Sequence, residues 1–119
     1  MAYDPNNIFA KILREELPCE KVFEDEYCLA FKDINPLAPI HILVIPKGDY
    51  LSQDDFSDHA PDDLIVGFGR AIGKVAKTLN LDVEGYRVIT NIGLEGGQIV
   101  PHLHYHILGG KSLGPMLGS

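Results

Sequence analysis

The stretch "PHLHYHILGG" (residues 101–110) places three histidines at every second position and ends in two glycines. Successive side chains of a β-strand point to opposite faces, so a strand here would set His102, His104 and His106 on one face, about 7 Å apart at Cα. The residues between them form an apolar opposite face. Three histidines in strict alternation are difficult to attribute to folding alone, so this pattern predicts a strand that carries function.

Around this stretch, β-branched and aromatic residues bounded by turn residues predict a sheet. The predicted strands cover residues 21–26, 27–34, 40–45, 85–91 and 102–108. The first two form a hairpin with an acidic turn, and the third is a central strand.

Two helices are predicted from apolar residues at helical spacing. The first has Asp4 as its N-cap and Pro5 at its first position, and the second begins at Pro61 and keeps an apolar face to Leu79. We therefore predict a single α+β domain (residues 1–119), a five-stranded antiparallel sheet with two main helices covering one side. Within the second helix, Gly69 and Gly73 indicate either a close packing contact or simple tolerance.

The amino-acid composition disfavours several kinds of partner and cellular location. The 119 residues include 17 acidic and 10 basic side chains, a formal net charge of -7 that disfavours nucleic acids and anionic membranes as partners. Cys19 and Cys28 have no metal-binding spacing, and we predict free, partly buried thiols. Without a signal-peptide pattern or a membrane-length apolar run, we expect a cytoplasmic protein.

The histidines suggest two kinds of chemistry. In the first, His-x-His on a strand and His41 from the central strand hold zinc, but no acidic residue flanks the histidines nearer than Glu95 to support such a site. In the second, a neutral imidazole attacks phosphorus and forms a phosphohistidine. The preceding loop favours the second, because Gly96 and Gly97 permit close backbone approach while Asn91 and Gln98 carry amide donors.

The sequence "HLHYHIL" (residues 102–108) matches the H-φ-H-φ-H-φ-φ signature of the histidine triad family of nucleotide hydrolases and transferases, where φ is an apolar residue. The segments "IFAKILREELP", "VFEDEYCLAFKDINPLAPIHILVIPK" and "GYRVITNIGLEGGQIVPHLHYHILGG" extend the resemblance to the Hint branch over nearly the whole chain. The resemblance implies that His104 is the nucleophile, that His106 contacts the phosphate, that His102 orients His104, and that His41 packs behind them.

The same resemblance implies a nucleotide site. Asp33 would accept the ribose hydroxyls. The apolar pocket for a purine base would comprise Ile8, Phe9, Ile12, Phe31 and Ile34. The positions that contact the phosphate would be Asn91, Gly97 and Gln98.

Two positions differ from many Hint proteins. Ile99 replaces a hydroxyl residue near the phosphate and leaving group, which leaves the leaving-group preference open. The C-terminal "KSLGPMLGS" lacks a tryptophan that some relatives place near the partner subunit's site.

The resemblance implies a purine nucleoside phosphoramidase that uses neither metal nor cofactor and forms a homodimer with one continuous sheet. Acyl-adenylates would be related substrates. The alternatives are a dinucleoside polyphosphate hydrolase and a nucleotide-binding regulatory module with little catalysis.

Overall fold

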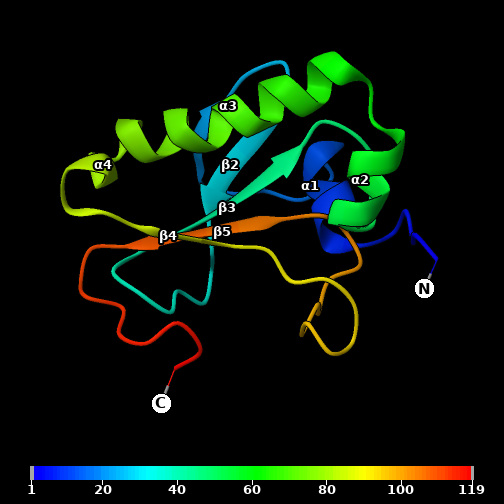
Figure 1. Cartoon of the computed structure of the whole chain (residues 1–119). Helices are drawn as coiled ribbons and strands as arrows, with labels where there is room; N and C mark the ends of the chain where they lie inside the picture. Colours follow the sequence, from blue (N-terminus) through cyan, green and yellow to red (C-terminus); the bar gives the residue numbers. More distant parts are fainter. Residues whose placement is uncertain (1, 119) are drawn as a thin grey trace.

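The computed structural model describes residues 2–118 and contains a five-stranded antiparallel sheet of order β1-β2-β3-β5-β4 (Figure 1). The strands are β1 (Lys21–Glu24), β2 (Cys28–Lys32), β3 (Ile40–Pro46), β4 (Arg87–Ile89) and β5 (Tyr105–Gly109). The helices are α1 (Ile8–Leu13), α2 (Gln53–His59), α3 (Asp62–Thr78) and α4 (Leu81–Glu84). The predicted α+β class and five-stranded sheet are confirmed.

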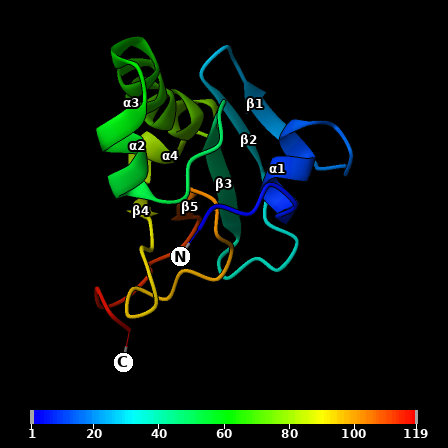
Figure 2. The same cartoon turned by 90° about the vertical axis from the view of Figure 1, so that its right-hand side faces the viewer.

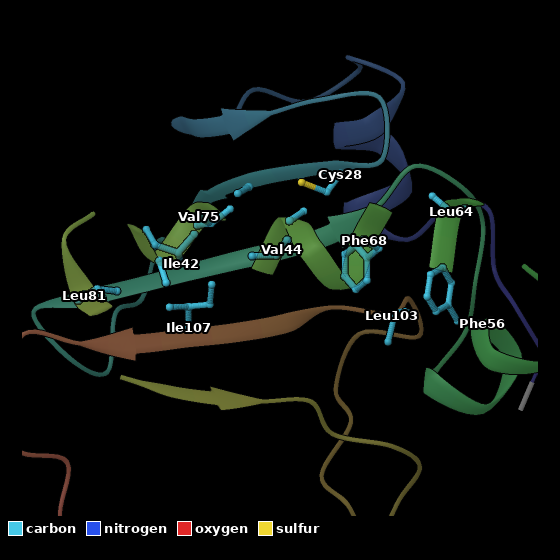
Figure 3. Close-up of a cluster of buried hydrophobic side chains, with 13 residues drawn as sticks. Cys28, Ile42, Val44, Phe56, Leu64, Phe68, Val75, Leu81, Leu103 and Ile107 are labelled. Carbon is cyan, nitrogen blue, oxygen red and sulfur yellow. The ribbon is translucent and has the colours of Figure 1, made fainter. Parts of the chain in front are cut away.

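The long helix α3 covers one face of the sheet. It begins after Pro61, as predicted, and its buried side chains include Leu64, Phe68 and Val75. These pack against Val44 and other inward-facing strand residues to form the larger core (Figure 3). Apolar side chains along one stripe of the helix therefore supply much of the driving force for this layer.

The short helix α1 covers the opposite face of the sheet (Figure 2). Phe9 and Ile12 of α1 form a second core with Phe31, Leu43, Ile45 and Leu29 from β2 and β3. The prediction that the helices cover one side is therefore wrong. The reason lies in β2 and β3, whose near-continuous apolar sequences are buried on both faces, as in a strand that is covered from two sides.

The start of α1 also differs from the prediction. Asp4 does not cap the helix, because its Oδ1 accepts a hydrogen bond from the Asn6 backbone N–H at 2.8 Å and forms a local turn. Asn7 is the N-cap, and its Oδ1 accepts from the Ala10 N–H at 2.9 Å. The helix therefore begins three residues later than Pro5, at Ile8.

The two strands nearest the histidines are shorter than predicted. β5 begins at Tyr105 because the backbone before it is bonded elsewhere: the Leu103 N–H donates to Tyr50 at 2.8 Å and the His102 N–H to Val100 at 2.8 Å. β4 spans only Arg87–Ile89. The helices α2 and α4 were not predicted. None of the helices within residues 2–118 has the length and apolar character of a membrane span.

The glycines of α3 divide into two kinds. A Cβ at Gly69 or Gly73 would meet nothing within 4 Å among residues 2–118, so of the two alternatives left open, neither glycine makes a close packing contact within this part of the chain. A Cβ at Gly67 would lie 2.2 Å from Cγ of Tyr27. The residue that needs to be glycine for packing is therefore Gly67, where the tyrosine ring lies against the helix backbone.

Candidate active site

The face of the sheet covered by α1 also carries the histidines. In β5, Tyr105 points toward α3, where its ring centroid lies 5.4 Å from that of Phe68. The ring centroids of His104 and His106 lie 5.0 Å apart, and that of Phe9 in α1 lies 4.9 Å from His104. The predicted alternation thus holds across this region, although only His106 of the three histidines lies within the strand itself.

A hydrogen bond fixes the protonation of His104. Its Nδ1 lies 2.7 Å from the carbonyl oxygen of His102, which can only accept, so Nδ1 carries the proton. In the neutral ring, Nε2 then bears a free lone pair. His104 is therefore arranged as a nucleophile or base that acts through Nε2.

A second series of hydrogen bonds determines which ring nitrogen of His106 carries the proton. The Leu37 N–H donates to Nδ1 of His41 at 3.1 Å, so the proton of neutral His41 lies on Nε2. This Nε2 lies 2.9 Å from Nδ1 of His106 and donates to it. Neutral His106 therefore carries its proton on Nε2 and is a hydrogen-bond donor, the opposite of His104.

The protein interior keeps these rings neutral. Burial lowers the pKa of His102 to about 4, and burial together with nearby His104 lowers the pKa of His106 to about 4. Burial also lowers the pKa of His104, partly opposed by its hydrogen bond to the His102 carbonyl and by the charge of Asp33. Burial lowers the pKa of His41 as well, partly opposed by the charge of Asp33. Near pH 7 the cluster thus presents uncharged imidazoles.

Asp33 lies directly after β2, beside the histidines. Its backbone N–H donates to the His41 carbonyl at 3.0 Å, its Oδ1 accepts from the Asn35 N–H at 2.8 Å, and its Oδ2 lies 3.4 Å from Nε2 of His41. An acidic residue therefore does lie beside the histidines, contrary to the expectation from the sequence, because the sheet brings Asp33 to them from a distant part of the chain.

Asp33, His41 and His106 could together hold a cation, since one donor atom from each lies within 4.8 Å of the others. The 2.9 Å contact between His41 and His106 has the geometry of a hydrogen bond with a proton between the rings. A cation would have to replace that proton and reorient both rings. The hydrogen-bonded arrangement itself is sufficient to orient His106.

The five apolar residues predicted to bind a base have different environments. Phe9, Ile12 and Phe31 are buried in the core beneath α1. Ile8 is 44% exposed and Ile34 is 85% exposed, so both present apolar surface to solvent. Phe9, Ile12 and Phe31 therefore form the floor of the predicted base pocket, and Ile8 and Ile34 remain free to contact a ligand.

The loop before the histidines depends on its glycines. A Cβ at Gly96 would lie 2.2 Å from the Ile92 carbonyl oxygen, and Gly97 has a φ of +79°, which L side chains rarely adopt. The close backbone approach of Gly96 is therefore made within the loop, whereas a Cβ at Gly97 would meet nothing within 4 Å among the described residues.

Gln98 braces this loop. Its Oε1 accepts from the Gly93 N–H at 3.0 Å, and its Nε2 donates to the carbonyls of Leu51 at 2.7 Å and Val100 at 3.2 Å. Asn91 is half-buried and takes no part in these three contacts, while Ile99 is 92% exposed. A phosphate contact from the Gln98 side chain would require exchange of one of its present bonds.

Two contacts to the histidines, and the contact of Tyr3 with Asp49, were not predicted. Tyr3 Oη lies 2.9 Å from Nδ1 of His102 and 3.2 Å from Oδ1 of Asp49, and the Thr90 hydroxyl donates to the His104 carbonyl at 2.9 Å. Tyr3 and His102 are 99 residues apart in sequence. No local sequence pattern could have indicated that pair.

Comparison with known proteins places this geometry in a family. A model of the HIT domain matches residues 14–113. The chain is 56% identical to a HIT-like protein of Azospirillum brasilense, with 97% of this chain and 94% of the relative covered. It is 49% identical to a HIT-like protein of Rickettsia prowazekii, with 93% and 92% covered.

Solved structures agree. A histidine triad protein from Clostridium difficile is 47% identical, with a TM-score of 0.83 over 96% of this chain and 98% of that one. A structure described as a HIT family hydrolase from Legionella pneumophila is 39% identical, with a TM-score of 0.84 over 95% of this chain and 100% of that one.

Proposed function

Because the chain belongs to the HIT domain family, we propose that it hydrolyses purine nucleoside 5'-phosphoramidates through a nucleotidyl intermediate on His104. The observation that carries this proposal is the bond from Nδ1 of His104 to the His102 carbonyl, which leaves Nε2 with a lone pair in a buried, uncharged ring. The purine preference rests on the resemblance to the Hint branch.

In the first step, Nε2 of His104 attacks the phosphorus atom and the phosphorus–nitrogen bond breaks. The leaving amine takes the electron pair of that bond and a proton from the solvent, which the attacking water returns to the solvent in the second step. His104 becomes an Nε2-nucleotidyl imidazolium, whose positive charge is stabilised by the His102 carbonyl through the Nδ1–H. His106, held with Nε2–H as a donor, would hydrogen-bond a phosphoryl oxygen as negative charge develops there.

In the second step, water attacks the same phosphorus atom and the bond to Nε2 of His104 breaks. The products are the nucleoside monophosphate and neutral His104. Over both steps one water molecule supplies the hydroxyl on phosphorus and the proton on the amine, so the protein returns to its initial state.

The remaining predicted residues would bind the nucleotide. The Asp33 carboxylate would accept the ribose hydroxyls, and the exposed side chains of Ile8 and Ile34 would contact the purine above the floor of Phe9 and Phe31. Asn91 would donate to the phosphate, with the loop held in place by Gln98. Ile99 offers no hydrogen bond, so an apolar leaving group would be accepted there as readily as a polar one.

The test compares rates on an adenosine phosphoramidate, a guanosine phosphoramidate, an acyl-adenylate and a diadenosine polyphosphate. We expect the phosphoramidates to be cleaved fastest and a nucleotidyl adduct on His104 to be found by mass spectrometry after rapid quenching. The His104→Ala variant should lose turnover by at least about a thousandfold and the adduct entirely, while still binding nucleoside monophosphate.

Other outcomes identify the alternatives. Faster cleavage of the diadenosine substrate would favour a dinucleoside polyphosphate hydrolase. Nucleotide binding with no adduct and no turnover would favour a regulatory module. Loss of activity after chelation, with recovery on adding a divalent cation, would contradict the metal-free route and favour a cation at Asp33, His41 and His106.

We also propose that the chain forms a homodimer through the β4 edge of its sheet. The support is an exposed edge strand in which Val88 is 39% exposed, together with solvent-facing apolar side chains nearby in sequence, such as Leu94 at 91%. Light scattering should give twice the chain mass of 13.1 kDa. A monomer at micromolar concentration would rule this out.

A further inference from the structure

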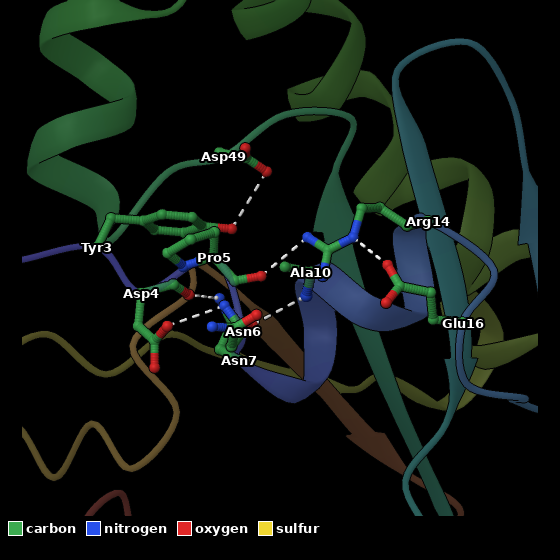
Figure 4. Close-up of polar contacts among 9 residues, drawn as sticks. All are labelled: Tyr3, Asp4, Pro5, Asn6, Asn7, Ala10, Arg14, Glu16 and Asp49. Carbon is green, nitrogen blue, oxygen red and sulfur yellow. Dashed lines mark hydrogen bonds and ion pairs between the residues drawn. The ribbon is translucent and has the colours of Figure 1, made fainter.

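Tyr3 lies in the segment that precedes α1, beside Asp49 (Figure 4), and its hydroxyl also reaches His102. Its hydroxyl lies between two partners, Oδ1 of Asp49 at 3.2 Å and Nδ1 of His102 at 2.9 Å. Its ring is also tilted against His102, with ring centroids 5.6 Å apart. Neither Tyr3 nor Asp49 belongs to the nucleotide site proposed above.

The segment that carries Tyr3 is held independently of the histidines. The side-chain amide of Asn7 donates to the Asp4 carbonyl at 2.7 Å, and Nη1 of Arg14 donates to the Pro5 carbonyl at 2.8 Å (Figure 4). Asn7 is itself buried and caps α1. Tyr3 therefore approaches His102 from a braced turn, so its hydroxyl meets the ring at little further cost in conformational entropy.

The hydrogen-bond partners decide where the protons lie. Nε2 of His102 is buried and has no partner within residues 2–118. A buried N–H without an acceptor is rarer and costlier than a buried lone pair without a donor, so the proton of neutral His102 lies on Nδ1. Nδ1–H then donates to Tyr3 Oη, and the Tyr3 O–H donates to the Asp49 carboxylate, which can only accept.

This series of hydrogen bonds, from Asp49 through Tyr3 to His102, leads to His104, the proposed nucleophile. His102 is fully buried, and its carbonyl accepts the Nδ1–H of His104 at 2.7 Å. The ring of Phe9 packs edge-on against both rings, with centroids at 6.1 Å from His102 and 4.9 Å from His104. Because the His102 ring and carbonyl belong to one residue, fixing the ring restricts the orientation of the carbonyl that holds His104.

We propose that Tyr3, supported by Asp49, is a positioning residue that anchors the His102 ring and thereby keeps the His104 imidazole oriented for attack through Nε2. The expected effect on kcat rests on the proposed function. The expected effect on the protonation pattern of the His102 and His104 rings does not.

The experiment uses the full chain without an N-terminal extension. Tyr3→Phe removes only the hydroxyl, Asp49→Ala removes its acceptor, and Asp49→Asn keeps a side-chain oxygen that can still accept. Tyr86→Phe is the matched control, since it removes the hydroxyl of a tyrosine that is 38% exposed and lies directly before β4, outside the proposed site. Each variant is measured for kcat and KM on an adenosine phosphoramidate, for thermal unfolding, and for the histidine ¹⁵N shifts that report which ring nitrogen is protonated.

We expect Tyr3→Phe to lower kcat about tenfold, equivalent to about 1.4 kcal/mol in the barrier, with KM changed less than twofold. Asp49→Ala should lower kcat by a smaller factor, and Asp49→Asn should restore most of the loss. The ¹⁵N signals of His102 and His104 should lose their single-tautomer pattern in Tyr3→Phe and keep it in Tyr86→Phe.

Two results would overturn the proposal. One is a Tyr3→Phe protein with unchanged ¹⁵N shifts and kcat within twofold of the parent chain. The other is a loss of kcat accounted for entirely by the unfolded fraction. If the parent chain has no phosphoramidase activity, the proposed function fails, and the ¹⁵N comparison still decides whether Tyr3 orders the two imidazoles.

Discussion

At the scale of single residues, His104 and His106 are the same side chain two positions apart, yet their hydrogen bonds make them chemical opposites. The His102 carbonyl takes the Nδ1 proton of His104, whereas His41 donates to Nδ1 of His106. One ring therefore presents a lone pair from Nε2, and the other presents an N–H. Transfer of a phosphoryl group to nitrogen requires both groups: a lone pair that attacks phosphorus, and a nearby N–H that hydrogen-bonds a phosphoryl oxygen.

The lowered pKa of His104 predicts the pH dependence of turnover. A buried imidazole resists protonation, so the neutral form persists below the ordinary pKa of about 6.5. We expect kcat/KM to be flat from pH 8 down to about 6.5 and to fall only at lower pH. A pH series in buffers of constant ionic strength measures it, and an acid limb centred above pH 6.5 would contradict the prediction.

At the scale of elements, the sheet separates two tasks. The face under α3 forms the larger core, and the face under α1 holds the histidines above a smaller core. β3 serves both faces, since Val44 lies in the larger core while His41 joins the histidines. A change on the α3 side should therefore alter stability with little direct effect on the chemistry.

Gly67 and Gly69 test this separation as a matched pair. Gly67→Ala would drive a methyl group into the Tyr27 ring, and such overpacking costs about 1–3 kcal/mol of unfolding free energy. Gly69→Ala enters open space and should stabilise the helix by up to about 1 kcal/mol. Urea unfolding measures both, and equal stability of the two variants would show that the Tyr27 contact is not tight.

At the scale of the whole molecule, burial of neutral histidines connects the site to stability. The unfolded chain binds protons at these histidines near pH 6.5, while folded His102 and His106 bind them only near pH 4. The stabilising contribution is therefore complete above about pH 6.5 and is lost as the pH falls toward 4.

For His102 alone the expected loss is about 3 kcal/mol, since its pKa falls from 6.5 to about 4 and one unit is worth about 1.4 kcal/mol. This loss is measured by comparing the unfolding free energies of the parent chain and of His102→Asn at pH 7 and at pH 4. The unfolding free energy of the variant should depend less on pH. His59→Asn, at an exposed histidine, is the control. The same pH dependence in His102→Asn and the parent chain would refute the assignment.

The sequence predicted those features that depend on local patterns. The α3 helix and the sheet follow from apolar periodicity, and α2 was missed because only Phe56 of its seven residues is buried. The cluster of histidines followed from alternation, but their separate roles came from family resemblance. Tyr3 could not be predicted, because its role depends on a contact with His102 that exists only in the folded chain.

That contact joins two segments that are far apart in the sequence. Tyr3 meets His102 across 99 residues, and His41 meets His106 across 65. During synthesis on a ribosome, the first pair cannot form until His102 has emerged, and the second cannot form until His106 has emerged. A chain truncated before residue 102 would thus lack the assembled histidines, and in a timed translation reaction the proposed hydrolase activity should appear only after residue 106 has left the ribosome.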